Sequence, residues 1–322
     1  MEKVSFVIPC YRSEKTIETV VKEICSTMDA MSKRYHYEII LIDDCSPDGT
    51  YEEIRKLAGS YRNVFGASLA KNFGQHSALM AGFHLISGDI VVCLDDDGQT
   101  PANEVGKLLD KINEGFDVVY ARYEHKHHSA FRNLGSKVNS LMAETMLGKP
   151  RELFLSSYFA ARRFVIEEMK RYDGAFPYVI GLILRSTKRI ANVTVEHRDR
   201  TCGVSGYSIG KLLGLWLNGF TSFSVKPLRA ASYVGAISAF LGLCYLVYVI
   251  ALRIFVNSAP AGWSTLIGIT LILGGLIMLM LGLIGEYVGR IYMCINNTPQ
   301  YLIRDQVRSS DEDGIIDEKG NT

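Results

Sequence analysis

The chain has 322 residues and a formal net charge of +1, with 35 Lys and Arg against 34 Asp and Glu. This length suffices for one large soluble domain and a further unit, and the near-zero charge argues against a nucleic-acid binder held by bulk charge. The seven scattered cysteines form no Cys-X-X-Cys pair, which favours reduced thiols in a cytosolic setting over a disulfide framework or a zinc site.

Apolar runs and helical periodicity alternate along the first part of the chain. The pattern predicts strands over residues 4–8, 38–42, 64–68, 90–94 and 117–121. Between them it predicts helices over residues 14–31, 51–58, 77–86 and 103–113. Such an alternation is typical of crossover units on a mostly parallel sheet, in which ligands bind outside the carboxyl ends of the strands.

The most informative stretch is residues 90–101, IVVCLDDDGQTP, in which an apolar run leads directly into three carboxylates. Asp95 and Asp97 are two residues apart, so in an extended segment they point to the same side. A hard divalent cation takes such oxygen ligands, and the side-chain carbonyl of Gln99 is a further candidate. Asp96 adds a third negative charge. A solvated acidic turn is the alternative that this triplet alone leaves open.

Other polar residues also follow predicted strands. Residues 9–11, Asp43 with Asp44, and residues 71–72 all fall at such ends. The glycine patterns of dinucleotide-binding and P-loop phosphate sites are missing, so neither kind of site is expected. A nucleotide held by carboxylates and a metal fits better. Asp43 or Asp44 would accept hydrogen bonds from a ribose or a base, while a cation neutralises a diphosphate.

Two long uncharged stretches mark the second half of the chain, over residues 230–252 and 262–285. Each is long enough to cross the bilayer core as a helix, and a buried helical hairpin of a soluble protein is the alternative. Apolar residues of 207–220 gather near one helical face, which favours a helix in the membrane interface over a core helix. Basic flanks predict that both ends of the hairpin are cytoplasmic, as does the absence of a signal peptide for the first domain. The acidic stretch from Asp305 onward is expected to be disordered.

A set of motifs in a fixed order carries a family resemblance. These motifs are VIPCY (7–11), IDDCSPDGT (42–50), KNFGQHSALMAGF (71–83), LDDDGQTP (94–101), the run of Arg200, Gly203, Ser205 and Tyr207, and GEYVGRIY (285–292). Together they resemble the inverting family 2 glycosyltransferases. More narrowly, they are similar to the polyisoprenyl-phosphate glycosyltransferases, namely the dolichyl-phosphate mannose synthases and their bacterial relatives that act on undecaprenyl phosphate. The similarity extends to about residue 304.

The resemblance implies an α/β fold of the GT-A nucleotide-diphospho-sugar transferase type with a mostly parallel sheet. It implies Mg²⁺ or Mn²⁺ as a cofactor, a homo-oligomer (a tetramer), and a place in the bacterial inner membrane. The expected organisation is a cytoplasmic catalytic domain over residues 1–205, amphipathic interface helices over 206–229, a two-helix transmembrane hairpin over 230–285, and a partly disordered cytoplasmic tail over 286–322.

The resemblance also implies roles for single residues on the donor side. Asp97, Gln99 and Asp95 match the metal site, with Asp95 also touching the donor. The positions that match the binding of the nucleotide sugar are Pro9, Tyr11, Ile42, Asp44, Lys71, Asp95, Asp96, Asp97, Arg122, Arg200 and Ser205.

On the acceptor side, Arg132 and Ser136 match a pair that grips a phosphate, and Arg122 is a further candidate. A spacing of four puts Arg132 and Ser136 on one face of a helix, as a phosphate clamp requires. Arg200 and Ser205 match a segment that closes over the donor diphosphate. The expected catalytic residues are Asp97, Arg132 and Arg200.

The sequence departs from the family pattern at three places. Ser13 replaces the usual Glu two residues after Tyr11, and Asp96 occupies the middle of the Asp-X-Asp motif. The segment 152–163 lacks the Asp that many relatives carry, so no general base is assigned. The chemistry does not require one, because a phosphate monoester loses its second proton near pH 6.

The leading hypothesis is therefore inverting transfer of one sugar from a nucleotide donor, UDP-linked, to undecaprenyl phosphate on the cytoplasmic membrane face. The lipid-phosphate sugar would serve the modification of cell-envelope glycans. Two alternatives stay open. A processive polysaccharide synthase would need a larger membrane region and a QxxRW-type signature, and a non-catalytic scaffold would bind sugar nucleotides without turnover.

Overall fold

The computed structural model describes residues 1–123, 152–196, 262–296 and 298–308, together with residues 144 and 150 and isolated positions between 228 and 255. The chain divides into two compact units. One consists of residues 1–211 and 297–322, and the other of residues 212–296. The second unit is therefore an insertion within the first.

In the described part of the first unit, one eight-stranded sheet has the order β7-β5-β6-β4-β1-β2-β3-β8. Its strands are β1 (Glu2–Cys10), β2 (Tyr35–Asp43), β3 (Val64–Leu69), β4 (Ile90–Cys93), β5 (Val118–Tyr123), β6 (Phe159–Arg162), β7 (Ile190–Val195) and β8 (Ile303–Val307). The four central strands β4, β1, β2 and β3 pair in parallel, as do β5 and β7. The mostly parallel α/β sheet expected from the sequence is confirmed. The antiparallel strand β6, between β4 and β5, is a departure from simple alternation.

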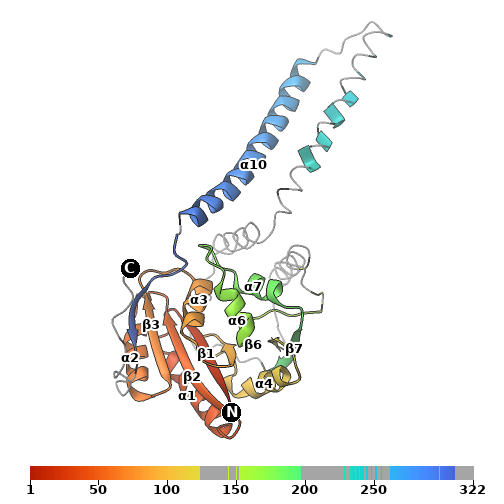
Figure 1. Cartoon of the computed structure of the whole chain (residues 1–322). Coiled ribbons are helices and arrows are strands. Elements are labelled where there is room, and N and C mark those ends of the chain that lie inside the picture. Colours follow the sequence, from red (N-terminus) through yellow and green to blue (C-terminus); the bar gives the residue numbers. More distant parts are fainter. Residues whose placement is uncertain are drawn as a thin grey trace. The chain divides into compact units, whose positions relative to one another are not determined.

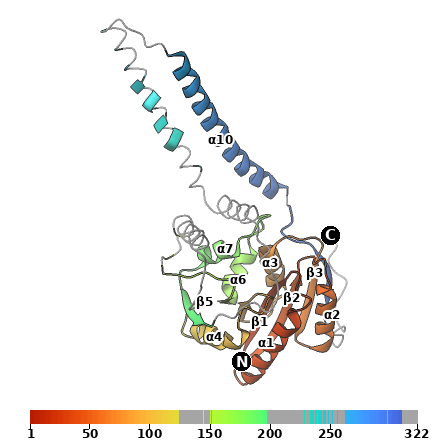
Figure 2. The same ribbon diagram turned by 180° about the vertical axis from the view of Figure 1, so that it is seen from behind.

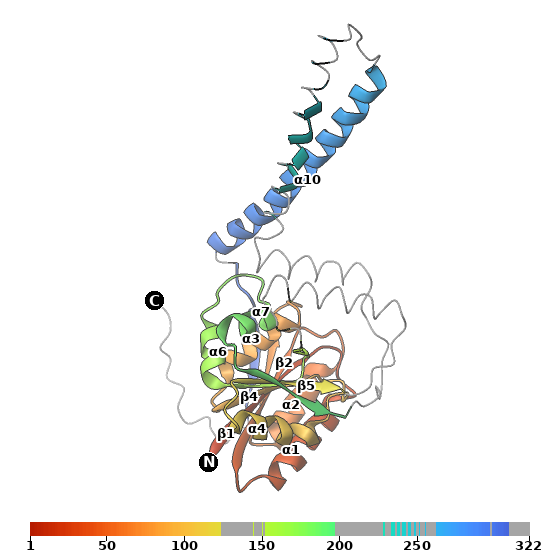
Figure 3. The same ribbon diagram turned by 90° about the vertical axis from the view of Figure 1, so that its right-hand side faces the viewer.

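Helices cover both faces of this sheet, as the three views of the ribbon show (Figures 1, 2 and 3). Helices α1, α2 and α4 pack on one face, and α3, α6 and α7 lie on the other. The elements are α1 (Ile17–Ala30), α2 (Thr50–Ser60), α3 (Gln75–Leu85), the short 3₁₀ turn η1 (Ala102–Glu104), α4 (Val105–Asn113), α6 (Arg163–Lys170) and α7 (Val179–Ser186).

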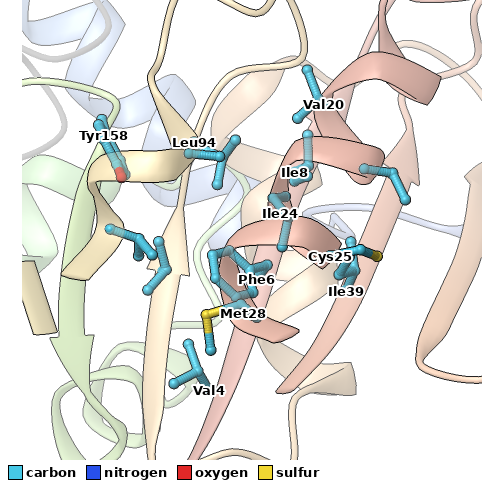
Figure 4. Close-up of a cluster of buried hydrophobic side chains, with 14 of the residues drawn as sticks. Val4, Phe6, Ile8, Val20, Ile24, Cys25, Met28, Ile39, Leu94 and Tyr158 are labelled. Carbon is cyan, nitrogen blue, oxygen red and sulfur yellow. The ribbon is translucent and has the colours of Figure 1, made fainter. Parts of the chain in front are cut away.

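The core between α1 and the sheet explains why this helix forms where the apolar spacing predicts it. Val20, Ile24 and Met28 recur at helical spacing and are buried. They pack with Phe6 and Ile8 of β1 in one cluster (Figure 4). Burying a side chain of this size contributes about 1.5–3 kcal/mol. The central strands therefore have little freedom, and the loops that leave their carboxyl ends start from rigid positions.

A buried carboxylate and a partly exposed lysine form an ion pair near the amino ends of the central strands. Glu38, which is only 3% exposed, pairs with Lys3 at 2.7 Å. Its carboxylate also accepts hydrogen bonds from the hydroxyl of Ser5 (2.6 Å) and from the backbone N–H of Ser87 (2.6 Å). Burial alone would raise the pKa of Glu38, but Lys3 and these hydrogen bonds lower it below its ordinary value. This buried carboxylate is thus fully compensated within the protein.

Strand β8 corrects the expectation of disorder from Asp305 onward. Residues Ile303–Val307 pair antiparallel with β3, and Asp305 lies opposite Ser68. Asp305 also forms an ion pair with Arg55 of α2. The polar composition misled the prediction because an edge strand exposes alternate side chains to water. Residues 309–322 lie outside the described part of the chain.

The second unit contains α10 (Trp263–Ile295), in which residues Leu273–Ile295 are long and apolar enough to cross a membrane. Large apolar side chains on it, such as Ile277 and Met278, are exposed. Among the described residues it is the one helix that meets this test of length and composition. The expected span 262–285 overlaps it. The other expected span, 230–252, and the interface helices lie largely outside the described residues, so two transmembrane helices are not confirmed.

Gly82 of α3 provides a test of how closely this helix approaches the sheet. A Cβ added there would lie 2.3 Å from Cγ1 of Val7 and 3.3 Å from Cγ1 of Ile42, both stiff β-branched side chains. We expect Gly82→Ala to lower stability by about 1–3 kcal/mol through overpacking, although better helix propensity offsets up to about 1 kcal/mol.

The matched control is Gly59→Ala in α2, where an added Cβ meets nothing within 4 Å. There the same change should raise stability by about 0.4–1 kcal/mol. Melting temperatures of the two variants in detergent check this expectation. An equal response to both substitutions would contradict the close packing of α3.

Candidate functional site

The carboxyl ends of the central strands meet at one edge of the sheet. In the parallel register, Pro9 of β1 lies opposite Ile42 of β2, and Cys10 lies opposite Asp43. Cys93 ends β4 on the other side of β1, where it pairs with Val7. The loops after these strands therefore emerge side by side, which is where ligands bind in open parallel sheets. Pro9 and Ile42 are buried in the strands themselves.

The loops after β1 and β2 have the same unusual backbone. Arg12 (φ 59°) and Cys45 (φ 54°) each lie two residues beyond a strand end and adopt the left-handed conformation. This costs roughly 1–3 kcal/mol for a residue other than glycine unless the surroundings enforce it. Here the backbone N–H of Arg12 donates to Oγ of Ser46 (3.1 Å), so that the loops hold one another. Tyr11, which directly precedes Arg12, is 45% exposed and is accessible to a ligand.

Asp44 links the loop after β2 to the loop after β3. It is 4% exposed, and its two carboxylate oxygens accept hydrogen bonds from the backbone N–H groups of Phe73 (2.7 Å) and Gly74 (2.8 Å). Burial raises the pKa of Asp44, and the two N–H groups oppose that rise. Gly74 has φ +91°, which other residues rarely adopt, so this loop requires glycine there. Asp44 therefore shapes the edge of the site.

The acid triplet follows β4 and begins with Asp95. Its carboxylate accepts hydrogen bonds from Nε2 of Gln75 (3.1 Å) and from the hydroxyl of Ser157. Desolvation raises the pKa of Asp95 to about 6, and the charges of Asp97 and Asp96 push it in the same direction. No Lys or Arg among the described residues forms an ion pair with Asp95. Within the described part of the chain, hydrogen bonds from Gln75 and Ser157 are thus what opposes the rise in the pKa of Asp95.

Asp96 and Asp97 accept hydrogen bonds from different partners. Asp96 accepts from the backbone N–H of Tyr11 (3.0 Å) and from the hydroxyl of Ser13. Asp97 accepts from the backbone N–H of Gln99 (3.0 Å) across Gly98, whose φ of 73° allows the tight turn. The turn holds the backbone of Gln99 against the carboxylate of Asp97.

These donors fit a hard divalent cation that shares its coordination with a ligand. Within the described residues, no group of three or more His, Cys, Asp and Glu forms a ready-made metal cage. Mg²⁺ in phosphate-binding sites usually takes one or two carboxylates, several waters and the substrate phosphates. Asp97 and Gln99 offer oxygen donors of that kind, and beside them the pKa of Asp95 is raised by burial first and by the charges of Asp97 and Asp96 second.

The remaining predicted residues are placed less centrally. Lys71 is exposed, and its Nζ lies 4.9 Å from the centre of the Phe73 ring. Arg122 is exposed near the end of β5. Its neighbour Tyr123 points to the opposite face of the strand, and the pKa of Tyr123 is raised by burial and by the charges of Asp95 and Asp97. Tyr123 therefore lies in the electrostatic field of the acids.

The structure also involves residues that the sequence did not single out. Gln75 and Ser157 donate hydrogen bonds to Asp95. The pKa of Tyr123 is raised by burial and, to a smaller extent, by the charge of Asp95. Gln75 lies inside a quoted motif, whereas Ser157 lies 62 positions from Asp95 and carries no local signal. Arg132, Ser136, Arg200 and Ser205 lie outside the described residues, so the predicted acceptor clamp and closing segment stay predictions.

Comparison with known families gives two matches. The model of glycosyl transferase family 2 matches residues 5–169, about half of the chain. The model of the GtrB C-terminal hairpin matches residues 226–291. The first match spans the acids of the candidate site, Asp44 and Asp95 to Asp97, and the second includes most of α10.

Similar proteins extend over nearly the full length. A protein of Edwardsiella ictaluri named undecaprenyl-phosphate 4-deoxy-4-formamido-L-arabinose transferase is 34% identical over 315 residues, covering 96% of each chain. A protein of the same name from Yersinia enterocolitica is 32% identical over 307 residues, covering 94% of this chain and 93% of its own.

Among solved structures, glucosyl-3-phosphoglycerate synthase of Mycobacterium tuberculosis has a TM-score of 0.49 at 21% identity, covering 66% of this chain and 75% of its own. The same enzyme in complex with Mn²⁺, UDP-glucose and phosphoglyceric acid has a TM-score of 0.46 at 22% identity, covering 62% and 72%.

The role of Asp44 as an anchor predicts a local effect of its removal. Asp44→Ala leaves the N–H groups of Phe73 and Gly74 without their acceptors. Hydrogen exchange in peptides that cover residues 71–75 should accelerate by about tenfold or more, equivalent to the loss of about 1.4 kcal/mol of local protection.

Asp48→Ala is the matched control, because Asp48 binds the N–H and hydroxyl of Thr50 at the start of α2 instead. It should leave exchange over residues 71–75 unchanged. Unaltered exchange in Asp44→Ala would show that other contacts hold the loop.

Proposed function

Because the chain belongs to glycosyltransferase family 2, we propose that it transfers a single sugar from a nucleoside-diphosphate donor, UDP-linked, to undecaprenyl phosphate. The product is a lipid-phosphate sugar for cell-envelope glycans. Relatives named for transfer to undecaprenyl phosphate support this acceptor, since they match over nearly their whole length. The sugar in their name, 4-deoxy-4-formamido-L-arabinose, is the first donor to test.

The observation that carries the proposal is the charge at the end of β4. Asp95, Asp96 and Asp97 lie together at the carboxyl edge of the sheet, and the pKa of Asp95 is raised by burial and by its two neighbours. Such a site attracts a cation, and a cation there attracts a diphosphate. The contrast with Glu38, which its own Lys3 neutralises, supports a site left open for a ligand.

The reaction is a displacement at the anomeric carbon with inversion. One phosphate oxygen of the lipid forms the new bond to that carbon while the bond to the nucleoside diphosphate breaks, and the diphosphate leaves with the electron pair. A bound Mg²⁺ or Mn²⁺, held by Asp97 and Gln99, would offset the charge that develops on the departing diphosphate. The lipid phosphate is already ionised at neutral pH, so no general base is needed.

The other residues would bind and orient the two substrates. Tyr11 and Lys71 are exposed and would contact a nucleoside, while the buried Pro9, Ile42 and Asp44 would support that surface from within the sheet. Arg132 and Ser136 would place the acceptor phosphate behind the sugar, with Arg122 nearby. Arg200 and Ser205 would close over the donor diphosphate. These assignments rest on the family pattern.

The membrane part of the proposal rests on α10 and the hairpin match. Exposed apolar side chains on a span-length helix are costly in water and favourable in lipid. We place the catalytic part, residues 1–205, on the cytoplasmic face of the inner membrane, with interface helices over 206–229, a hairpin over 230–285 and the tail beyond it. Such an arrangement brings a lipid-borne phosphate to a water-soluble donor.

Replacing the metal-binding acid tests the chemistry. Asp97→Ala should lower sugar transfer in purified membranes by about 100-fold or more, because one electrostatic contact in a transition state is worth about that factor. The assay uses labelled sugar nucleotides and undecaprenyl phosphate, and reports the lipid-linked product.

Asp110→Ala is the control, since Asp110 is exposed on α4 and makes only a surface ion pair with Arg34. It should transfer at the wild-type rate. Full activity in Asp97→Ala would refute the metal role, and a long polymer as product would refute single transfer.

Binding of the donor should be visible without turnover. A true donor with Mn²⁺ raises the melting temperature, because a ligand at 100 times its Kd adds about 2.7 kcal/mol to the folded state. The screen compares UDP-, GDP- and CMP-linked sugars, each with Mn²⁺ and with EDTA. EDTA should abolish the shift. A shift of equal size in EDTA would show that the diphosphate binds without a metal, and a GDP-linked donor as the best ligand would correct the base.

A further inference from the structure

Asp96 differs from its two neighbours in the direction of its contacts. Its oxygen Oδ2 accepts from the backbone N–H of Tyr11 (3.0 Å) and from the hydroxyl of Ser13. Oγ of Ser13 in turn lies 3.0 Å from the N–H of Tyr11 and also accepts from it. The middle acid of the triplet thus reaches across to the loop after β1, away from the pairing of Asp95 with Gln75 and Ser157.

Ser13 is a rigid partner for this contact. It is 2% exposed, and its N–H donates to Oγ1 of Thr50 at the start of α2 (2.8 Å). Its carbonyl oxygen accepts from the N–H groups of Thr16 and Ile17, both at 3.0 Å, in the first turn of α1. Ser13 is therefore hydrogen-bonded to the starts of two helices. A residue that binds Ser13 is held in a fixed position by these contacts.

The chemistry of the two side chains explains why these positions belong together. The ionised carboxylate of Asp96 only accepts hydrogen bonds, and the hydroxyl of Ser13 supplies the donor. A second carboxylate at position 13 would repel Asp96 instead of donating to it.

We infer that Asp96 is a positioning residue that works as a pair with Ser13 to lock the loop after β4 onto the loop after β1. The pair holds Tyr11 where a nucleoside would stack and holds the turn that carries Asp97 and Gln99. The expected effect of this pair on catalysis rests on the proposed function. The expected effect of the pair on the structure of the two loops does not depend on that function. In this role the carboxylate of Asp96 binds the loop after β1 and is not a metal ligand.

A charge-swap series tests the pair. Ser13→Glu alone should raise the donor KM by about tenfold or more and lower the melting temperature in EDTA, where no metal contributes. Adding Asp96→Asn to Ser13→Glu should restore both values to within about threefold and a few degrees of the wild type, because an amide can donate to Glu.

The matched control is Ser13→Glu combined with Asp97→Asn, which has the same net charge but removes the neighbouring acid. It should not restore the melting temperature. Equal rescue by the two combinations would reduce the effect to bulk charge and overturn the pair. So would an increase of about tenfold in the Mn²⁺ requirement of Asp96→Asn with an unchanged melting temperature in EDTA, because Asp96 would then be a metal ligand.

A second series of variants tests the pair even if the Ser13→Glu variant fails to fold. Ser13→Ala, Asp96→Ala and the double variant form a cycle measured by melting in EDTA and by the donor KM. We expect the double variant to lose no more than the worse single variant. Additive losses would show that the two residues act independently. If the wild type transfers no sugar, the proposed function fails, while the melting cycle still decides whether the pair exists.

Discussion

The structure depends on carboxylates gathered at the carboxyl ends of parallel strands, where no Lys or Arg among the described residues forms an ion pair with Asp44, Asp95 or Asp96. Asp44, Asp95 and Asp96 are instead held by hydrogen bonds from the loops around them, namely from Phe73 and Gly74, from Gln75 and Ser157, and from Tyr11 and Ser13. Each acid therefore organises a neighbouring loop. The same acids therefore shape the site, and a cation bound among them would stabilise their charges.

The amino and carboxyl ends of the central strands differ in how their buried acids are held. At the amino end, the buried Glu38 is compensated by Lys3 and two serines. At the carboxyl end, Arg12 and Cys45 adopt the left-handed conformation beside the acids of the candidate site. A rigid core of β1 and α1 lies between these ends. Strain and excess charge can persist at one edge because the rest of the sheet over-determines its geometry.

Sequence patterns predicted much of this fold because local rules dominate the first half of the chain. Apolar runs mark β1 to β5, and the spacing of Val20, Ile24 and Met28 marks α1. Strand β8 escaped prediction since its pairing with β3 joins residues far apart in the sequence. The acids of the site were predictable because they follow strands. The partner Ser157 was not, since it reaches Asp95 only through the antiparallel placement of β6, which no local pattern encodes.

The return of the chain to the sheet as β8 constrains its path through a bilayer. Residues 303–307 hydrogen-bond to the same sheet as the N-terminal strand, so the chain begins and ends its route on one side. A path that leaves and returns to the same side traverses the barrier an even number of times. A chain that crossed a bilayer through α10 alone could therefore not pair β8 with β3 as it does here.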